Sequence, residues 1–357
     1  MRVNLKDVAT QAGVSIQTVS NVVNGKHAHV GDDARQRVLA AIDALGYRPN
    51  VAARSLRRGR VGIIALAIPD LANPYYSEIG AAIIAEAALR SYTVLLDNTR
   101  FERASESLAA GGLLPHAIDG VILEPHSVRL EDLEPRHHAV PIVLLGENLR
   151  DAPYDRVVID NVAAAQVATR HLLDLGRRRI AAIGIDPRKT QGAAVLRLEG
   201  FTSAITEAGR LVDPRLLVHG GHWHRLNGAQ AMRALLALDD PPDAVFCFND
   251  LLALGAMWAA QEAGYRIPDD IAVVGFDDIE DGHFATPSLS TIDPDKAGLG
   301  HLAVSLLMDR MAGQRTGPPE WIRLPFQLRA RKSTIGTTTG HAVPCGTDII
   351  ESTAARL

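Results

Sequence analysis

After residue 60 the sequence alternates between short apolar runs and segments with helical periodicity, and this alternation restricts the possible folds more than any other feature. The runs are almost continuously apolar, which is typical of strands that are covered on both faces. Strands that alternate with helices predict a doubly wound α/β fold with parallel sheets. The expected strands are residues 61–69, 92–96, 120–124, 142–146, 157–160, 180–185, 216–218, 245–248, 271–276 and 289–292.

The same pattern places helices between these strands and indicates two sheets. About ten strands are more than one sheet of this type usually contains, so we expect two α/β lobes. A chain of 357 residues is long enough for two or three domains. The expected helices lie near residues 75–91, 103–113, 161–175, 195–209, 227–238, 250–264 and 295–313.

Several of the expected strands end in polar residues. Because ligands of open α/β sheets bind beyond the carboxyl ends of the strands, these residues predict a ligand cleft between the lobes. An alternative for Asp70, Asp250 and Asp278 is helix capping, since acids are common in first turns. The polar strand ends are Asp70, Glu124, Glu147, Asp186, Asn249, Asp250, Asp277 and Asp278.

The first 25 residues have the pattern of two short helices joined by a tight turn. Asn4 and Asp7 are spaced as a variant capping box, which predicts the start of the first helix. Gly13 is expected to end it, because glycine readily adopts the left-handed backbone conformation. Ser15 is the expected N-cap of a second helix that runs to Val23. Two short helices with a glycine-containing turn form a helix-turn-helix.

A third helix is expected at residues 32–45. Its apolar stripe would consist of Val38, Leu39, Ile42 and Leu45, which recur at helical spacing. The three helices together predict a small all-α domain at the start of the chain.

Charge is distributed unevenly along the chain, whose net charge is −4. Residues 1–60 contain ten Lys or Arg and four Asp, so this head carries a net charge of +6 and the remainder −10. A basic head on an acidic body is typical of a protein that binds nucleic acid through one end.

A three-helix bundle without a DNA role is the alternative interpretation of the head. Three features favour DNA binding: the charge asymmetry, an outward-facing group on the second helix, and a basic, Ala-rich helical segment at residues 47–60. The outward-facing group is expected to comprise Ile16, Gln17, Ser20 and Asn21.

The segments DVATQAGVSIQTVSNVVNG and YRPNVAARSL together resemble the DNA-binding domain and hinge helix of the LacI/GalR family of bacterial repressors. The resemblance extends over nearly every residue from 4 to 60. It implies a sequence-specific transcriptional regulator, expected to be a repressor. Such a protein would act as a homodimer on a pseudo-palindromic operator in double-stranded DNA.

The resemblance also implies which residues contact DNA. Gln17 can form a bidentate pair with adenine, and Ile16 can contact a thymine methyl group. Asn21 would also face base edges. The family often has arginine at this position, which prefers guanine, so the resemblance does not imply a guanine preference for Asn21. Most of the others would bind phosphates and fix the register. The full set is Ser15, Ile16, Gln17, Thr18, Ser20, Asn21, Asn24, His29, Asn50, Ala53, Arg54, Leu56 and Arg57.

Leu56 has a separate role in this resemblance. It would insert into the minor groove at the operator centre and kink the DNA, with Arg54 and Arg57 on the flanking backbone. The alternative is that Leu56 is a core residue of the hinge helix.

For the rest of the chain the resemblance implies a periplasmic-binding-protein-like effector domain. The expected fold class is therefore an all-α helix-turn-helix DNA-binding head plus an α/β effector domain of two doubly wound lobes. The expected boundaries are 1–48 for the DNA-binding domain, 49–60 for the hinge helix, 61–335 for the effector-binding and dimerisation domain and 336–357 for a flexible tail. Lobe one would contain 61–160 and about 292–323, and lobe two 161–291 and about 324–335.

Four motifs, IPDLANPYY, RLEGF, FNDLLALG and VGFDD, resemble effector-binding segments of the family. Arg197 and Asp277 can bind vicinal hydroxyls or a carboxylate, and aromatic rings can supply apolar faces. Alternatively, Tyr76 belongs to the core and Arg197 to a helix surface. The residues implied to bind the effector are Asp70, Asn73, Tyr75, Tyr76, Glu124, Glu147, Arg197, Trp223, Asn249 and Asp277.

Sugars are the commonest ligands of the family, so a carbohydrate or sugar derivative is the expected effector. Gly146 and Glu147 depart from the Asp-Arg pair that is frequent at this loop, which points to a different effector. A sugar acid or a nucleobase therefore stays open.

The sequence contains no convincing catalytic or metal-binding constellation. His219, His222 and His224 could ligate zinc, but no carboxylate or cysteine motif completes the shell. No nucleophile–base motif is apparent, so we expect neither a cofactor nor an enzyme. The alternative is an α/β enzyme with a fused DNA-binding head, and an assay for substrate turnover would distinguish the two.

A solute-binding protein for transport is the other alternative. It predicts a signal peptide and no basic head, whereas the N-terminus lacks an apolar segment. No apolar stretch is long enough to span a membrane. Two cysteines, Cys247 and Cys345, indicate no disulfide framework. We therefore expect a cytoplasmic protein, and a dimer because residues 336–357 lack leucine heptads.

Overall fold

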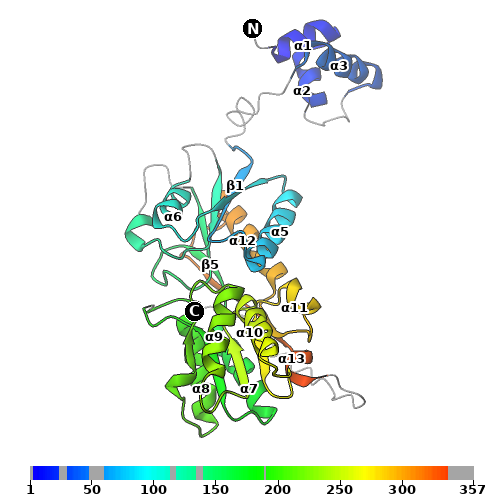
Figure 1. Cartoon of the computed structure of the whole chain (residues 1–357). Helices are drawn as coiled ribbons and strands as arrows, with labels where there is room; N and C mark the ends of the chain where they lie inside the picture. The colour runs from blue at the N-terminus through cyan, green and yellow to red at the C-terminus, as the bar shows by residue number, and fades with distance from the viewer. Residues whose placement is uncertain are drawn as a thin grey trace. The chain divides into compact units, whose positions relative to one another are not determined.

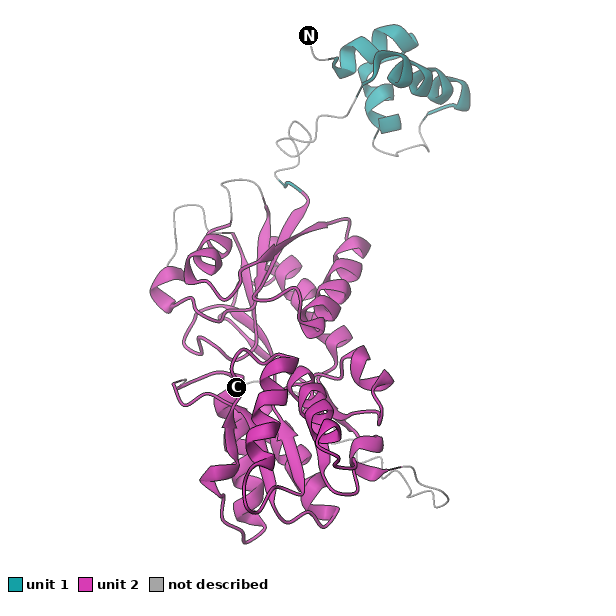
Figure 2. Cartoon of the chain, viewed as in Figure 1, with its two compact units in different colours: residues 1–61 teal, residues 62–357 magenta. Residues whose placement is uncertain are grey.

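The computed structural model describes residues 3–23, 30–47, 60–112, 118–133, 140–188 and 190–336. The chain divides into two compact units, Met1–Val61 and Gly62–Leu357 (Figure 2). Most of the expected hinge helix and tail lies outside the described residues. The same is true of seven residues that the sequence assigns to DNA contact, namely Asn24, His29, Asn50, Ala53, Arg54, Leu56 and Arg57.

The first unit contains three helices: α1 (Leu5–Ala12), α2 (Ile16–Val23) and α3 (Asp32–Leu45). The capping box of α1 is confirmed, because the Asn4 side chain accepts from the Asp7 backbone and the Asp7 side chain accepts from the Asn4 backbone. Gly13 ends α1 at φ 64°. The Ser15 hydroxyl then accepts a hydrogen bond from the Thr18 backbone at 3.0 Å, which caps α2. These caps set a tight turn between α1 and α2.

The core of this unit is formed by one fully buried valine from each helix, Val8, Val19 and Val38. Two expectations for side chains here are wrong. Leu39 is 44% exposed, because Val38 and Ala41 occupy the buried face of α3 instead. Ser20 is only 8% exposed, since its small side chain lies beside the apolar face of α2 rather than opposite it.

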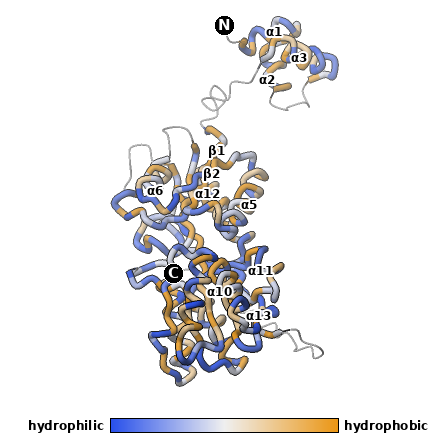
Figure 3. The backbone as a smooth tube through the Cα atoms, viewed as in Figure 1, coloured by the Kyte–Doolittle hydropathy of each residue, from blue (hydrophilic) through white to orange (hydrophobic). Residues whose placement is uncertain are grey.

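The second unit contains two six-stranded sheets. The first has the order β11-β5-β4-β3-β1-β2, and all its strands are parallel. Its strand β1, next to the edge strand β2, is buried along most of its length, and its apolar character is visible in Figure 3. The strands are β1 (Ile63–Ile68), β2 (Thr93–Asn98), β3 (Gly120–Leu123), β4 (Ile142–Leu145), β5 (Asp155–Ile159) and β11 (Trp321–Leu324).

Three helices cover the first sheet and complete what we call lobe one. They are α5 (Pro74–Leu89), α6 (Arg103–Ala110) and α12 (Lys296–Met311). The helices α5 and α12 pack together on one face, and α6 lies on the other (Figure 1). A short 3-10 turn, Leu130–Leu133, packs near α6.

The second sheet forms lobe two and has the order β12-β10-β9-β8-β6-β7. Its strands are parallel except for β12, which is antiparallel to β10. The elements of lobe two are α7 (Asn161–Asp174), β6 (Ile180–Ile185), α8 (Ala193–Glu207), the 3-10 turn Pro214–Leu216, β7 (Leu217–His219), α9 (Arg225–Leu236), β8 (Ala244–Cys247), α10 (Asp250–Glu262), β9 (Ala272–Phe276), α11 (Glu280–Phe284), β10 (Ser290–Asp293), β12 (Gln327–Arg329) and α13 (Lys332–Ile335).

The chain passes between the two lobes three times: between β5 and α7, between β10 and α12, and between β11 and β12. This arrangement brings the carboxyl ends of both sheets to the junction of the lobes. The predicted class, an all-α head followed by two doubly wound lobes, is confirmed. Of the described residues, no helix has the length and hydropathy needed to cross a membrane.

Apart from the two 3-10 turns, four short elements were not anticipated from the sequence: β11, β12, α11 and α13. The strand β11 is amphipathic and includes Arg323, so nothing in its composition marks a buried strand. It forms because Trp321 to Leu324 pair in parallel with residues 156–159 of β5, a partner more than 160 residues earlier in the chain.

Candidate functional site

The exposed side of α2 carries the residues that the sequence assigns to base readout. Ile16 is 49% exposed although it is apolar. Gln17 is exposed as well, and its side-chain amide donates to the Asn21 carbonyl oxygen at 3.0 Å. This bond leaves the Gln17 oxygen and the Asn21 amide nitrogen available, so one acceptor and one donor are presented side by side. The Ser15 and Thr18 hydroxyls lie 2.9 Å apart at the start of the same helix.

In the second unit, residues from both lobes converge at the carboxyl ends of the strands. Glu124 and Glu147 lie just after β3 and β4, and Asp277 lies just after β9. Arg197 lies in the first turns of α8. Tyr75 and Tyr76 begin α5, with their ring centroids 5.2 Å apart, and their pKa values are raised by burial and by Glu124 and Asp277.

Arg197 is the cation at the centre of this group. It is only 6% exposed, which excludes the surface-helix alternative. Its Nε donates to the Asn161 side-chain oxygen at 2.7 Å, and its Nη1 donates to the Phe248 carbonyl oxygen. The guanidinium lies 3.4 Å from the centroid of the Phe276 ring. These contacts hold a buried charge in one orientation.

Asp277 is buried beside Arg197. Burial raises the pKa of its carboxyl group to about 7, although Arg197 and Lys296 oppose the shift. Its backbone has φ 113°, and the next residue, Asp278, has φ 49°. Such left-handed conformations are unfavourable for residues other than glycine and concentrate at functional sites.

The raised pKa of Asp277 predicts a pH-dependent stability. Between about pH 4 and pH 7 the folded protein retains a proton that an unfolded aspartate has lost, so the free energy of unfolding falls as the pH rises. A shift of three pKa units corresponds to roughly 4 kcal/mol in the free energy of unfolding, and the protein has lost all of this contribution above pH 7. Asp277→Asn should therefore be more stable than the wild type at pH 8, and the gain should shrink towards pH 5.

Thermal and urea unfolding between pH 5 and pH 8 measure this difference. Asp186→Asn is a suitable control, because Arg188 lowers the pKa of Asp186 to about 2, below the whole window. This control should leave the slope of stability against pH unchanged. Parallel curves for Asp277→Asn and the wild type would contradict a raised pKa.

Several other residues implied to bind the effector have local structural roles. Asp70 accepts from the Ala72 backbone at 3.0 Å, and Asn73 caps α5 by accepting from the Tyr75 backbone at 3.1 Å. Asn249 caps α10 through the Leu252 backbone and donates to the Trp223 carbonyl oxygen. Their side chains are therefore partly occupied by the protein itself.

Trp223 lies between β7 and α9, at the edge of the cluster. Its indole N–H donates to the Gly184 carbonyl oxygen at 3.0 Å, and its backbone has φ 60°. The ring packs edge-on against Phe248, and the Arg197 guanidinium lies 5.6 Å from the ring centroid. Trp223 thus packs on Phe248, and both Trp223 and Phe276 lie beside the Arg197 guanidinium.

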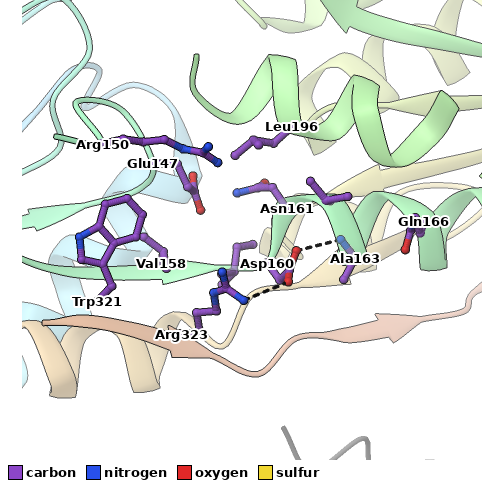
Figure 4. Close-up of a pocket in the computed structure, with 12 residues that line it drawn as sticks. Glu147, Arg150, Val158, Asp160, Asn161, Ala163, Gln166, Leu196, Trp321 and Arg323 are labelled. Atoms are coloured by element: carbon purple, nitrogen blue, oxygen red, sulfur yellow. Dashed lines mark hydrogen bonds and ion pairs between the residues drawn. The ribbon is translucent and has the colours of Figure 1, made fainter. Parts of the chain in front are cut away.

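A cavity of about 360 Å³ opens where the lobes join (Figure 4). Glu147 contributes from lobe one, and Asn161 and Leu196 contribute from lobe two. Figure 4 shows the Glu147 carboxylate facing Asn161 and the bridge between Asp160 and Arg323 at the base. The lining residues are Glu147, Arg150, Val158, Ile159, Asp160, Asn161, Val162, Ala163, Gln166, Leu196, Trp321 and Arg323.

Sequence reasoning missed three residues that organise this site. Asn161 orients Arg197, and Arg156 holds the Glu147 loop by donating to the carbonyl oxygens of Gly146, Asn148 and Leu149. Lys296 donates to the Asp277 and Asp278 carbonyl oxygens. None follows a recognisable motif; the only signal for Asn161 and Lys296 is that each adjoins a chain crossing between the lobes.

Direct contacts also join the two lobes. The His224 Nε2 lies 3.0 Å from an Asp70 carboxylate oxygen. On lobe one, Glu78 accepts from the Glu280 backbone of lobe two at 3.1 Å, and within lobe one it also forms an ion pair with Lys296 at 3.2 Å. The bonds between the lobes must rearrange if the lobes open.

Two of the histidines that could have ligated zinc have different neighbours in the structure. His219 accepts from the Gly221 backbone and lies 3.6 Å from Asp186, whereas His224 faces Asp70. Throughout the described part of the chain, no group of three or more His, Cys, Asp or Glu side chains could hold a metal ion.

The fold defines a class of protein in which a helix-turn-helix head precedes a two-lobed α/β unit. Residues 4–50 match the model of bacterial regulatory proteins of the lacI family, and residues 169–334 match a periplasmic binding protein-like domain. Together with the relatives below, these matches show that the chain belongs to the lacI family of bacterial transcriptional repressors.

Known relatives match the chain along almost its whole length. The transcriptional repressor PurR of Mannheimia succiniciproducens is 35% identical over 331 residues, which are 92% of this chain and 98% of that protein. The structure of the Lac repressor dimer bound to operator and the anti-inducer ONPF is 32% identical, with a TM-score of 0.80 over 94% of this chain and 99% of that one. A complex of the regulator CelR with cellobiose is 32% identical, with a TM-score of 0.68 over 93% of this chain and 100% of that one.

Proposed function

We propose that this protein is a transcriptional repressor whose affinity for a specific operator is controlled by a small-molecule effector bound between its two lobes. The buried cluster around Arg197 is the observation that carries the effector role. It places a desolvated cation, ionisable carboxyl groups and aromatic rings at the carboxyl ends of two sheets, where ligands of such folds bind. The head acts on chromosomal DNA, so the site of action is the cytoplasm.

For operator recognition, we assign base readout to Ile16, Gln17 and Asn21. The acceptor of Gln17 and the donor of Asn21 match the donor and acceptor on the major-groove edge of adenine. Ile16 supplies an apolar contact for a thymine methyl group. The sequence resemblance adds Leu56, with Arg54 and Arg57, as the minor-groove element of this proposal.

We further propose that the protein acts as a homodimer through the second unit. The edge strand β2 exposes Leu95 and Leu96, and the adjoining helix α5 exposes Ile84. Lobe two exposes Trp258 and Phe284. Exposed large apolar side chains on an edge strand favour association with a second chain. Two heads would then read half-sites about one helical turn apart.

A carbohydrate or sugar derivative is the proposed effector class, in keeping with the cellobiose held by CelR. Binding would change the bonds between the lobes, among them Asp70 with His224 and Lys296 with Asp277. A coupling free energy of about 1–3 kcal/mol between effector and operator is typical of such systems.

Operator readout is tested by selection of DNA sites from a randomised duplex pool. The wild type should select a pseudo-palindrome, and Gln17→Ala should reduce discrimination at one base pair per half-site by about 1–3 kcal/mol, because a bidentate contact is lost. Gln11→Ala replaces another exposed glutamine of the head, on α1, and should leave the selected sequence unchanged. An unaltered base preference in Gln17→Ala would remove Gln17 from readout, and failure of the wild type to select any sequence would refute the proposed function.

A further inference from the structure

Two glutamates of lobe one lie side by side at the ligand site. Glu124 and Glu147 follow the neighbouring parallel strands β3 and β4, in which Leu123 is paired with Leu144. The Glu124 carboxylate lies over Gly146, the residue before Glu147: a Cβ atom at position 146 would be 3.1 Å from Glu124 Oε1. The sheet itself therefore brings the two acids together.

One of these acids, Glu147, lacks a full set of partners within the protein. Its carboxylate is hydrogen-bonded by the Asn161 side chain and by the backbone of Ile159, but it is only 7% exposed and its Oε1 is buried without a hydrogen-bond partner. In the described ranges, neither glutamate forms an ion pair with a lysine, arginine or histidine. A buried carboxylate oxygen without a donor is unfavourable, so its place in a folded site calls for a ligand that supplies one.

The nearby arginines do not fill this need. Arg156 directs its terminal nitrogens to three backbone carbonyl oxygens, and Arg197 is bonded to Asn161 and Phe248. Arg323 lies 3.6 Å from Asp160, and Arg150 is exposed at the cavity rim. Each of these cations has another partner or is solvated, which leaves the pair of glutamates as acceptors.

The pKa shifts of the two glutamates also favour a positively charged ligand. Burial raises the pKa of Glu124 well above its usual value, and the Glu147 charge raises it further, whereas Arg156 and Arg197 oppose the shift. Burial also raises the pKa of Glu147, although the Arg197 charge and hydrogen bonds from Asn161 and the backbone oppose the shift without cancelling it. Two desolvated carboxylates in one place are stabilised by a positive charge between them.

We propose that the effector is a small hydroxylated amine, such as an amino sugar, whose ammonium group lies between Glu124 and Glu147. This inference rests on the proposed function, because it names the ligand of the same site. An ammonium group donates three hydrogen bonds and neutralises the pair, which a hydroxyl group cannot do. Glu147 lines the cavity of about 360 Å³, which is within the size range of small-molecule sites, whereas Glu124 is not among the lining residues and adjoins Glu147 through Gly146. In this cavity the ring would contact Asn161, Leu196 and Trp321.

The test compares charged and neutral forms of the same ring with the full-length protein. Thermal melts and calorimetric titrations would use glucosamine, galactosamine and mannosamine, each beside its parent hexose and its N-acetyl derivative. At least one amine should raise the melting temperature, and its two neutral counterparts should bind at least about tenfold more weakly.

Two isosteric variants locate the effect. Glu147→Gln and Glu124→Gln should each weaken binding of the amine by about 10- to 100-fold, since each removes one charge-assisted hydrogen bond. Binding of the parent hexose should change by much less. Glu131→Gln, at an exposed glutamate of the same lobe, serves as the control and should bind the amine like the wild type.

Each result separates the ligand proposal from the proposed function. The ligand proposal is overturned if a hexose or N-acetyl sugar binds as tightly as its amine, if none of the amines raises the melting temperature, or if both glutamine variants bind the amine normally. Site selection on DNA, performed with the same preparation, reports on the repressor function independently.

Discussion

Arg197→Ala is expected to bind operator DNA as the wild type does, but to need at least about 100-fold more effector for the same response. The substitution removes a buried guanidinium that stacks on Phe276 and is bonded to Asn161 and Phe248. It also removes the positive charge that most opposes the raised pKa of the Asp277 carboxyl group. Truncating one partner of a buried, hydrogen-bonded charge pair in a complex typically costs about 2–5 kcal/mol of binding free energy, which is why the effect is large.

The measurement is an operator titration in the presence of the ligand that raises the melting temperature of the wild type. Arg188→Ala is a matched control, because Arg188 is an exposed arginine of the same lobe whose side chain contacts Asp186. Circular dichroism verifies that both variants are folded. A wild-type response in Arg197→Ala would exclude Arg197 from effector binding.

Gly255→Ala is expected to lower the melting temperature of the second unit by about 5–10 °C, through a loss of about 3 kcal/mol. The helices α9 and α10 pack so closely that a Cβ atom at position 255 would lie 1.9 Å from the Arg225 carbonyl oxygen and 3.0 Å from the Ala229 nitrogen. At the facing position, a Cβ atom on Gly228 would lie 2.0 Å from the Leu252 carbonyl oxygen. Backbone atoms cannot move aside as the end of a side chain can, so the two helices must separate.

Intrinsic helix propensity opposes this prediction, which makes the experiment informative. Alanine is favoured over glycine inside a helix by about 1 kcal/mol, so a loosely packed site would show stabilisation. Gly317→Ala is the control, because nothing lies within 4 Å of a Cβ atom there. It should be neutral or slightly stabilising in the same thermal melt. Unchanged or increased stability of Gly255→Ala would show that the helices are not in such close contact.

The helix caps and turns of the head could be predicted because they depend on residues close together in the sequence. Asn4, Asp7, Gly13 and Ser15 act within four positions of the atoms they bond. The errors at Leu39 and Ser20 arise because helical periodicity gives the direction of a side chain only approximately, while the packing of three helices determines which directions are covered.

The effector site could be predicted only in part. The rule that ligands bind beyond the carboxyl ends of strands selected Glu124, Glu147 and Asp277. It did not reveal that Asn161 orients Arg197, nor that Lys296 reaches the Asp277 loop. Those contacts join segments 36 and 19 positions apart in sequence.

The amino-acid sequence by itself determined the main strands and helices and their order, though not β11, β12, α11 and α13, because apolar periodicity, caps and turn residues act over a few positions. It also determined the separation of a basic head from an acidic body. Only the tertiary structure decided which charges are buried together, as in the pairing of Glu124 with Glu147 across β3 and β4. Burial and strand pairing depend on residues far apart in the chain, and the chemistry of the ligand site follows from those long-range contacts.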